Sequence, residues 1–197
     1  VYAVFLEYAD HHVGRLLEQL QQLRILDDTL VFYIIGDNGA SAEGTFNGTF
    51  NELLSLNGLV GVETPEFLAA RLEQLGGPAS YNHYAVGWAH AMNTPYQWSK
   101  QVASHLGGTR NGTIVHWPKG IRAKGEIRAQ FHHVIDVAPT ILEAAGLPQP
   151  ISVNGVQQRP IEGFSMCYSF DDAQAPERHE TQYFEMFGNR GIYHKGW

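Results

Sequence analysis

The feature that most constrains the fold of this chain is an apolar run, Leu30 to Ile35, followed at once by the turn Gly36-Asp37-Asn38-Gly39. A short run rich in β-branched and aromatic side chains is typical of a strand buried on both faces, and it is far too short to cross a membrane. In open α/β sheets, ligands bind beyond the carboxyl ends of the strands. The turn after Ile35 is therefore the first place to look for function.

Asp37 and Asn38 are the candidate metal ligands of this turn. They offer a carboxylate and an amide oxygen, which are the donors that hard cations such as calcium and magnesium prefer. Asp-Asn-Gly after a strand is also ordinary turn chemistry. The local sequence leaves both interpretations open.

The composition indicates a globular protein and excludes some partners. The chain has 197 residues, of which 44% are hydrophobic and 17% charged, so we expect one sizeable domain with a real core. A net charge of −7 argues against nucleic acid and anionic lipid as partners, and we find no membrane segment. Cys167 is the single cysteine, so no internal disulfide is possible. We expect a soluble protein whose compartment stays open, with bacterial periplasm and cytoplasm as alternatives.

Alternating helix and strand patterns predict an α/β sheet. Apolar spacing predicts helices over residues 1–23 and 134–145, with Asp136 able to cap the start of the second. Residues 113–117 read as a second strand, and 182–187 with 191–194 as a β-hairpin. Thr64 and Pro65 resemble a helix entry, for a helix reaching residue 75. Strand and helix in this order are typical of α/β proteins.

Residues 77–112 form a long segment without clear periodicity, rich in tyrosine, tryptophan and histidine. An irregular stretch this long inside a compact domain is usually functional or disordered, and so many aromatic residues favour a packed, functional one. Lys100 is its single lysine. Lys100 is either a surface residue or, beside an anionic substrate, a charge clamp.

Seven segments of the chain carry a resemblance to a known family. They are the strand ending in GDNG, NTPYQWSK (93–100), HLGG (105–108), the strand ending in HWPKG, DVAPTILEAAGLP (136–148), GFSMCYSF (163–170) and QYFEMFGNRGIYHKGW (182–197). Taken together, these segments resemble the sulfatases, the arylsulfatase branch of the alkaline-phosphatase-like superfamily. They occur in the family's order and span nearly the whole chain.

The resemblance implies a sulfuric ester hydrolase that uses formylglycine and calcium, or magnesium in its place, on a small-molecule sulfate ester. It places Asp37 and Asn38 as metal ligands and Lys100 as the residue that contacts the sulfate. His105, which precedes Leu106 and the glycine pair, is the second catalytic candidate. Calcium and lysine would both oppose the negative charge of the transition state.

The family's nucleophile motif, Cys/Ser-x-Pro-x-Arg, does not occur in this sequence. We therefore expect a C-terminal portion of a sulfatase, with an alkaline-phosphatase-like sheet flanked by helices, incomplete, and ending in the hairpin. Residues 1–148 would belong to the α/β catalytic domain, and 149–197 to its C-terminal loop and hairpin segment. Alone, the chain should be inactive and should need the missing N-terminal part or self-associate.

Two other functions stay open at this stage. The parent could be a phosphodiester or phosphonate monoester hydrolase of the same superfamily, because the strand and the metal pair would look alike. The chain could also be a non-catalytic, calcium-dependent binding module descended from the enzyme. A nucleophile motif upstream of Val1 would distinguish the enzymes from the module.

Overall fold

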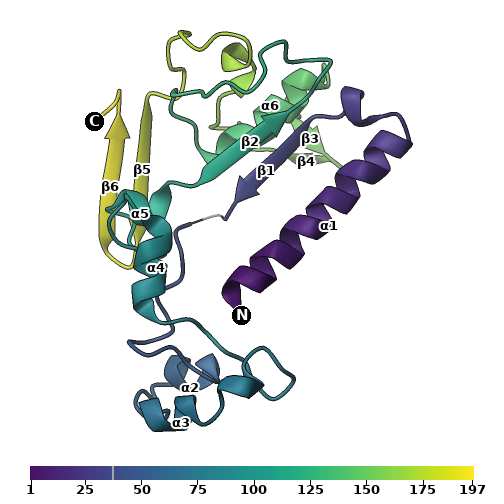
Figure 1. Cartoon of the computed structure of the whole chain (residues 1–197). Coiled ribbons are helices and arrows are strands. Elements are labelled where there is room, and N and C mark those ends of the chain that lie inside the picture. Colours follow the sequence, from purple (N-terminus) through teal and green to yellow (C-terminus); the bar gives the residue numbers. More distant parts are fainter. Residues whose placement is uncertain (37) are drawn as a thin grey trace. The chain divides into compact units, whose positions relative to one another are not determined.

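The computed structural model describes residues 1–36 and 38–197, so Asp37 lies outside the described residues. Figure 1 shows the elements in chain order. The α-helices are α1 (Tyr2–Gln22), α2 (Glu52–Leu56), α3 (Pro65–Ala69), α4 (Val86–Asn93), α5 (Leu106–Thr109) and α6 (Val137–Ala144). The strands are β1 (Val31–Ile35), β2 (Gly112–His116), β3 (Ser152–Val153), β4 (Val156–Gln157), β5 (Thr181–Met186) and β6 (Asn189–His194).

The chain divides into two compact units, each built from segments that are distant in sequence. The first contains Val1–Leu16, Ile34–Gly112 and Phe184–Gly191, and the second contains Leu17–Tyr33, Thr113–Tyr183 and Ile192–Trp197. The first unit holds the turn after β1 and Lys100, and the second holds α6. The predicted boundary at residue 148 stays a prediction.

The two predicted strands are confirmed: β1 comes before the turn, and β2 follows the segment that carries Lys100. β1 pairs with β2 in a two-stranded sheet. The expectation that β1 is buried on both faces is wrong for this chain: Val31 to Tyr33 are half-buried, while Ile34 and Ile35 are 37% and 50% exposed. A strand is buried on both faces only where layers cover both, and β2 is the only strand paired with β1 in the described chain.

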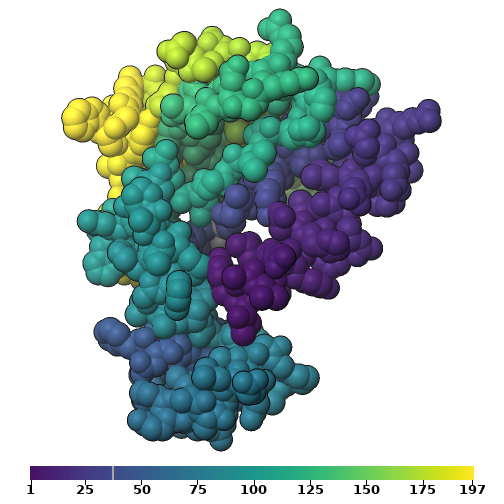
Figure 2. Space-filling model, viewed as in Figure 1, coloured from purple at the N-terminus to yellow at the C-terminus, as the bar shows by residue number. Residues whose placement is uncertain are grey.

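Helix α1 is confirmed within one residue of its predicted ends, and all of it is described. It contains no buried residue, and large apolar side chains along it are exposed, among them Val4, Phe5 and Tyr8. The surface of its first turns is in view at the purple end of Figure 2. The expected sizeable core is therefore wrong for the described chain, whose buried hydrophobic residues are Ala89, Met166 and Phe170.

Local helix signals are confirmed more closely at their starts than at their ends. Thr64 caps α3 by accepting a hydrogen bond at Oγ1 from the Phe67 N–H at 3.2 Å, with Pro65 in the first turn. The helix ends at Ala69 rather than at residue 75, and a short 3₁₀ turn follows at Leu72–Gln74. The segment 77–112 is not irregular throughout, because it contains α4 and α5.

The C-terminal hairpin is confirmed, since β5 and β6 pair and only Phe187 and Gly188 separate them. Strands joined by so short a connection are antiparallel. The mixture of helices and strands is confirmed as well. The described strands form two-stranded sheets, so the larger alkaline-phosphatase-like sheet stays a prediction. Among the described residues we find no helix with the length and apolar character that crossing a membrane requires.

The second unit is organised around one buried carboxylate, Asp136, which is fully inaccessible. It accepts hydrogen bonds from the backbone N–H groups of His133 and Phe164, both at 2.8 Å, and from Nδ1 of His179 at 2.8 Å. The prediction that Asp136 caps α6 is wrong, because in the described structure its carboxylate gives α6 no cap hydrogen bond. It turns back to His133 instead, in a capping box around the preceding 3₁₀ turn.

Burial by itself raises the pKa of the Asp136 carboxyl, but neighbouring donors lower the pKa to about 2. These neighbours are the rings of His132 and His179 and the N–H groups of His133 and Phe164. The His132 ring acts across a longer gap, since its Nδ1 lies 3.8 Å from Oδ2, whereas the other three are within hydrogen-bond length. The carboxylate therefore stays charged inside the fold.

Replacing Asp136 with alanine should lower the free energy of unfolding by about 3–5 kcal/mol, because it leaves buried donors without their acceptor. Urea denaturation of the protein measures this. Asp28→Ala is the matched control, since Asp28 pairs with Lys119 at 2.9 Å on the surface of the same unit. That exposed pair should contribute only about 0–1 kcal/mol. Equal losses in the two variants would contradict the central role of Asp136.

The stability of the protein should also fall in acid through Asp136. The folded-state pKa of about 2 lies below the ordinary value of 3.8, so its contribution is present above about pH 4 and is lost as the pH falls toward 2. Denaturation of wild type and Asp136→Asn across this range checks it. The advantage of wild type should shrink by roughly 2 kcal/mol between about pH 4 and pH 2. A constant difference across the range would contradict the assignment.

Candidate functional site

Two backbone segments of the first unit meet directly after β1. The Lys100 N–H donates to the Ala40 carbonyl at 3.1 Å, and the Ala40 N–H donates to Oδ1 of Asn93 at 3.0 Å. Asn93 also donates from Nδ2 to the Trp98 carbonyl at 2.9 Å. The structure thus brings the loop that follows Asn38 beside the segment that carries Lys100.

Glycine is required where these segments touch. A Cβ on Gly39 would lie 1.5 Å from the Gly107 carbonyl oxygen, and a Cβ on Gly107 would lie 2.2 Å from the carbonyl oxygens of Gln97 and Trp98. No side chain can be placed at such distances without moving the backbone. Gly39 therefore permits the contact with Gly107, and Gly107 permits its own segment to fold back on Gln97 and Trp98.

The side chain of Lys100 is held by Glu43. Its Nζ donates to Oε2 of Glu43 at 3.0 Å, and the two side chains are 32% and 30% exposed. An ammonium group has three N–H donors. Within the described part of the chain, this bond uses one of them, and two remain for an anion.

Glu43 is itself fixed by further donors. Ser41 Oγ donates to Oε2 at 2.7 Å, and Gln101 Nε2 donates to Oε1 at 2.9 Å. The Ser41 hydroxyl also lies 2.8 Å from Nε2 of His83, whose Nδ1 donates to the Tyr84 carbonyl at 2.8 Å. The carboxylate is therefore held by donors from two segments of the chain, and His83 supports the Ser41 donor from a third.

The pKa of the Glu43 carboxyl lies below its ordinary value. The largest cause is the hydrogen bond from Ser41, followed by that from Lys100; burial acts in the opposite direction, and the charges of Lys100 and His83 add to the lowering. Glu43 is therefore ionised at neutral pH. Lys100 and Glu43 form an ion pair rather than a neutral hydrogen bond.

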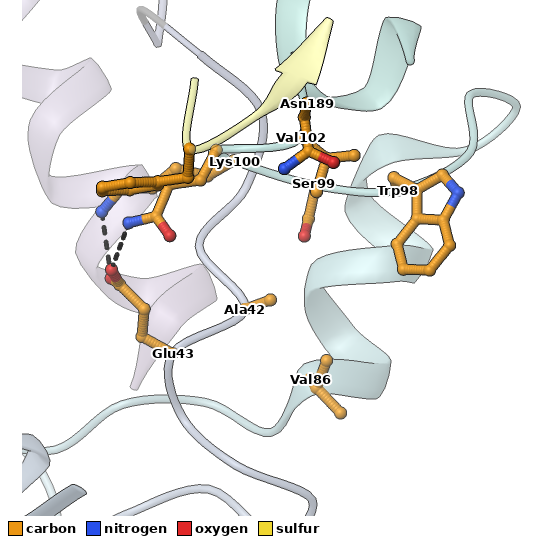
Figure 3. Close-up of a pocket in the computed structure, with 10 residues that line it drawn as sticks. Ala42, Glu43, Val86, Trp98, Ser99, Lys100, Val102 and Asn189 are labelled. Atoms are coloured by element: carbon orange, nitrogen blue, oxygen red, sulfur yellow. Dashed lines mark hydrogen bonds and ion pairs between the residues drawn. The ribbon is translucent and has the colours of Figure 1, made fainter. Parts of the chain in front are cut away.

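A cavity of about 430 Å³ opens beside this pair. Figure 3 shows Glu43, Lys100, Trp98 and Val86 around it, with the two dashed contacts from nitrogen meeting at the Glu43 carboxylate. The cavity combines one ion pair with apolar and amide side chains, so it can hold an anionic group joined to an organic one. Its lining residues are Ala42, Glu43, Val86, Trp98, Ser99, Lys100, Gln101, Val102, Phe187 and Asn189.

Of the two predicted metal ligands, Asp37 lies outside the described residues and Asn38 lies within them. Asn38 is half-buried and lies one residue before Gly39, at the contact with Gly107. Carboxylate and amide oxygens fit calcium, which takes 6–8 oxygen ligands. Among the described residues no group of three or more His, Cys, Asp or Glu side chains is placed to hold a metal ion. The donor chemistry of Asp37 and Asn38 suits calcium, and the pair would supply part of a coordination shell.

His105 lies at the start of α5, and the described residues that line the cavity do not include it. Its Nδ1 is 2.9 Å from the Ser104 hydroxyl, and its ring lies 5.8 Å from the Trp98 ring, between centroids. His105 therefore contacts Trp98, which lines the cavity, but does not line the cavity itself. Its catalytic role stays a prediction.

Sequence reasoning missed Glu43, Gln101 and the hairpin residues Phe187 and Asn189. Glu43 had a usable signal, because it is the single charged residue between Asn38 and Asn51 in a loop of small side chains. An isolated carboxylate such as Glu43, close in sequence to the candidate turn, indicates an ion-pair partner for Lys100. The hairpin residues carry no such signal, because only the tertiary fold brings them to the cavity.

Comparison with known proteins agrees with these motifs. A family model described as Sulfatase matches residues 1–147. An uncharacterized sulfatase of Schizosaccharomyces pombe is 33% identical over 151 residues, which are 76% of this chain and 25% of that protein. An arylsulfatase of Klebsiella aerogenes is 29% identical over 192 residues, which are 95% of this chain and 37% of that protein.

The chain therefore spans 25% and 37% of the lengths of these two relatives. The family model, by contrast, covers well over half of this chain, and it includes both the turn after β1 and Lys100. The chain belongs to the sulfatase family.

Proposed function

We propose that the whole protein hydrolyses sulfate esters and that this chain supplies the contact to the sulfate group. The observation that carries the proposal is the position of Lys100. In a member of the sulfatase family, it lies in the wall of a cavity of about 430 Å³, bonded through its backbone to the loop that follows β1. The arylsulfatase relative favours an aryl sulfate as the substrate class.

Lys100 suits this chemistry for electrostatic reasons. A sulfate ester carries a permanent negative charge, and cleavage of its S–O bond places further negative charge on the leaving oxygen. A fixed ammonium group stabilises that charge more in the transition state than in the ground state. With one N–H held by Glu43, Lys100 is oriented before the substrate arrives.

Asp37 and Asn38 would hold the metal ion at the end of β1. A bound calcium would oppose negative charge on the sulfate group as a Lewis acid. Magnesium is the alternative. The remaining ligands and the formylglycine nucleophile would come from other parts of the whole protein, so we propose that this chain alone is inactive. We further propose that the exposed apolar faces of α1 and β1 meet those parts within an alkaline-phosphatase-like sheet, or meet another copy when they are absent.

Lys100→Ala in the whole protein should lower kcat/KM for an aryl sulfate by about 10²–10³, the effect of removing one preorganised charge from a transition state. Steady-state kinetics measures this. Lys119→Ala is the matched control, because Lys119 is an exposed lysine of the second unit that pairs with Asp28 and does not line the cavity. It should leave kcat/KM unchanged.

Equal activity of wild type and Lys100→Ala would remove Lys100 from the mechanism. Turnover of a matched aryl phosphonate monoester, without turnover of the sulfate, would instead support a phosphonate hydrolase.

The metal prediction concerns Asn38. Asn38→Ala should raise the calcium concentration that restores activity after chelation by about 10-fold or more, because it removes one oxygen ligand of a hard cation. Asn57→Ala, at an exposed helix end in the same unit, is the control and should leave that concentration unchanged. Full activity of wild type in the presence of a chelator would contradict the metal site.

A further inference from the structure

The ion pair between Lys100 and Glu43 places a negative charge where an anion is expected to bind. Glu43 Oε2 lies 3.0 Å from Nζ of Lys100, and both groups line the same cavity. If an anion binds to the two remaining N–H groups of Lys100, only the ammonium group separates it from the Glu43 carboxylate. Its attraction to Lys100 and its repulsion from Glu43 act together.

Glu43 cannot simply leave when an anion arrives. Ser41 and Gln101 donate to its two carboxylate oxygens at 2.7 and 2.9 Å, independently of Lys100. Ser41 is in turn held at 2.8 Å by His83. The carboxylate would lose these hydrogen bonds by moving, so it stays in the wall of the cavity (Figure 3).

We propose that Glu43 is a specificity-determining residue that shifts the preference of this site from anions of two negative charges toward anions of one, by weakening the binding of dianions more than that of monoanions. The inference rests on the proposed role of Lys100 as the anion contact. Coulomb energy is proportional to the product of the charges, so a dianion suffers twice the repulsion from Glu43 that a monoanion does. A sulfate ester is a monoanion, whereas a phosphate monoester above its second pKa is a dianion.

The same preference separates substrate from product. Hydrolysis adds water across the S–O bond, giving an alcohol and hydrogen sulfate, which then loses its proton to water and becomes the sulfate dianion. The bound ester has one negative charge and the released product has two. Glu43 therefore favours release of sulfate over retention, and it limits inhibition by the product.

The test uses two tetrahedral probes that differ by one charge, inorganic sulfate and methyl sulfate. Their dissociation constants are measured by calorimetry on the whole protein at low ionic strength, where charges are least screened. Glu43→Gln keeps the size of the side chain and an oxygen acceptor but removes the charge. Glu73→Gln, an exposed site in the same unit, changes the net charge equally and should alter neither constant.

The expected result is that the fold-change in the dissociation constant of inorganic sulfate equals the square of the fold-change for methyl sulfate. If Glu43→Gln strengthens methyl sulfate binding about threefold, it should strengthen inorganic sulfate binding about tenfold, because the dianion gains twice the energy. Glu43→Ala, which removes the charge without introducing an amide group, should give the same relation between the two fold-changes. Both constants come from one protein sample, so a loss of folded protein cancels from their ratio.

Equal fold-changes for the two probes in the Glu43 variants would overturn the inference, and so would no binding of either probe to any variant. Turnover of an aryl sulfate by wild type is measured separately and tests the proposed function. Turnover with equal fold-changes refutes only the role of Glu43. The square relation without turnover refutes only the proposed hydrolysis.

Discussion

The candidate site depends on the close approach of two backbones, at Gly39 and Gly107. A methyl group on Gly39 would come within 1.5 Å of the Gly107 carbonyl oxygen, so the two segments can meet only because residue 39 carries no side chain. This contact and the hydrogen bond from Lys100 to Ala40 fix the start of the lysine side chain relative to the end of β1. The chemistry assigned to the turn and to Lys100 therefore needs a packing constraint between glycines that are far apart in sequence.

Local signals in the sequence were enough to predict individual elements. The stripe of leucines predicted α1, Thr64 with Pro65 predicted the start of α3, and the glycine between two strand patterns predicted the hairpin of β5 and β6. Each of these depends on neighbouring residues alone. The burial of β1 and the partner of Lys100 could not be predicted in this way, because they depend on what lies across from them in space. The metal ligands Asp37 and Asn38 and the catalytic roles of Lys100 and His105 remain predictions.

Two paired carboxylates in this chain show how burial decides the role of a charge. Asp136 is fully inaccessible, and its hydrogen bonds come from backbone groups and from the buried His179, so its charge stabilises the second unit. Glu43 is equally well supplied with donors, but it is 30% exposed and lines a cavity. A pair with this exposure contributes little to stability. Its position is better explained by its effect on what binds next to it.

The overall charge of the chain makes such a local arrangement useful. With a net charge of −7, this chain repels anions at long range, so the proposed recognition of a sulfate group would have to rely on contacts within the cavity. A single unpaired lysine would attract every anion in proportion to its charge, and would hold the sulfate product more strongly than the ester. Pairing that lysine with Glu43 gives up some affinity for all anions, but the loss grows with the charge of the anion. The pair thereby reduces the advantage that the doubly charged product would have over the ester.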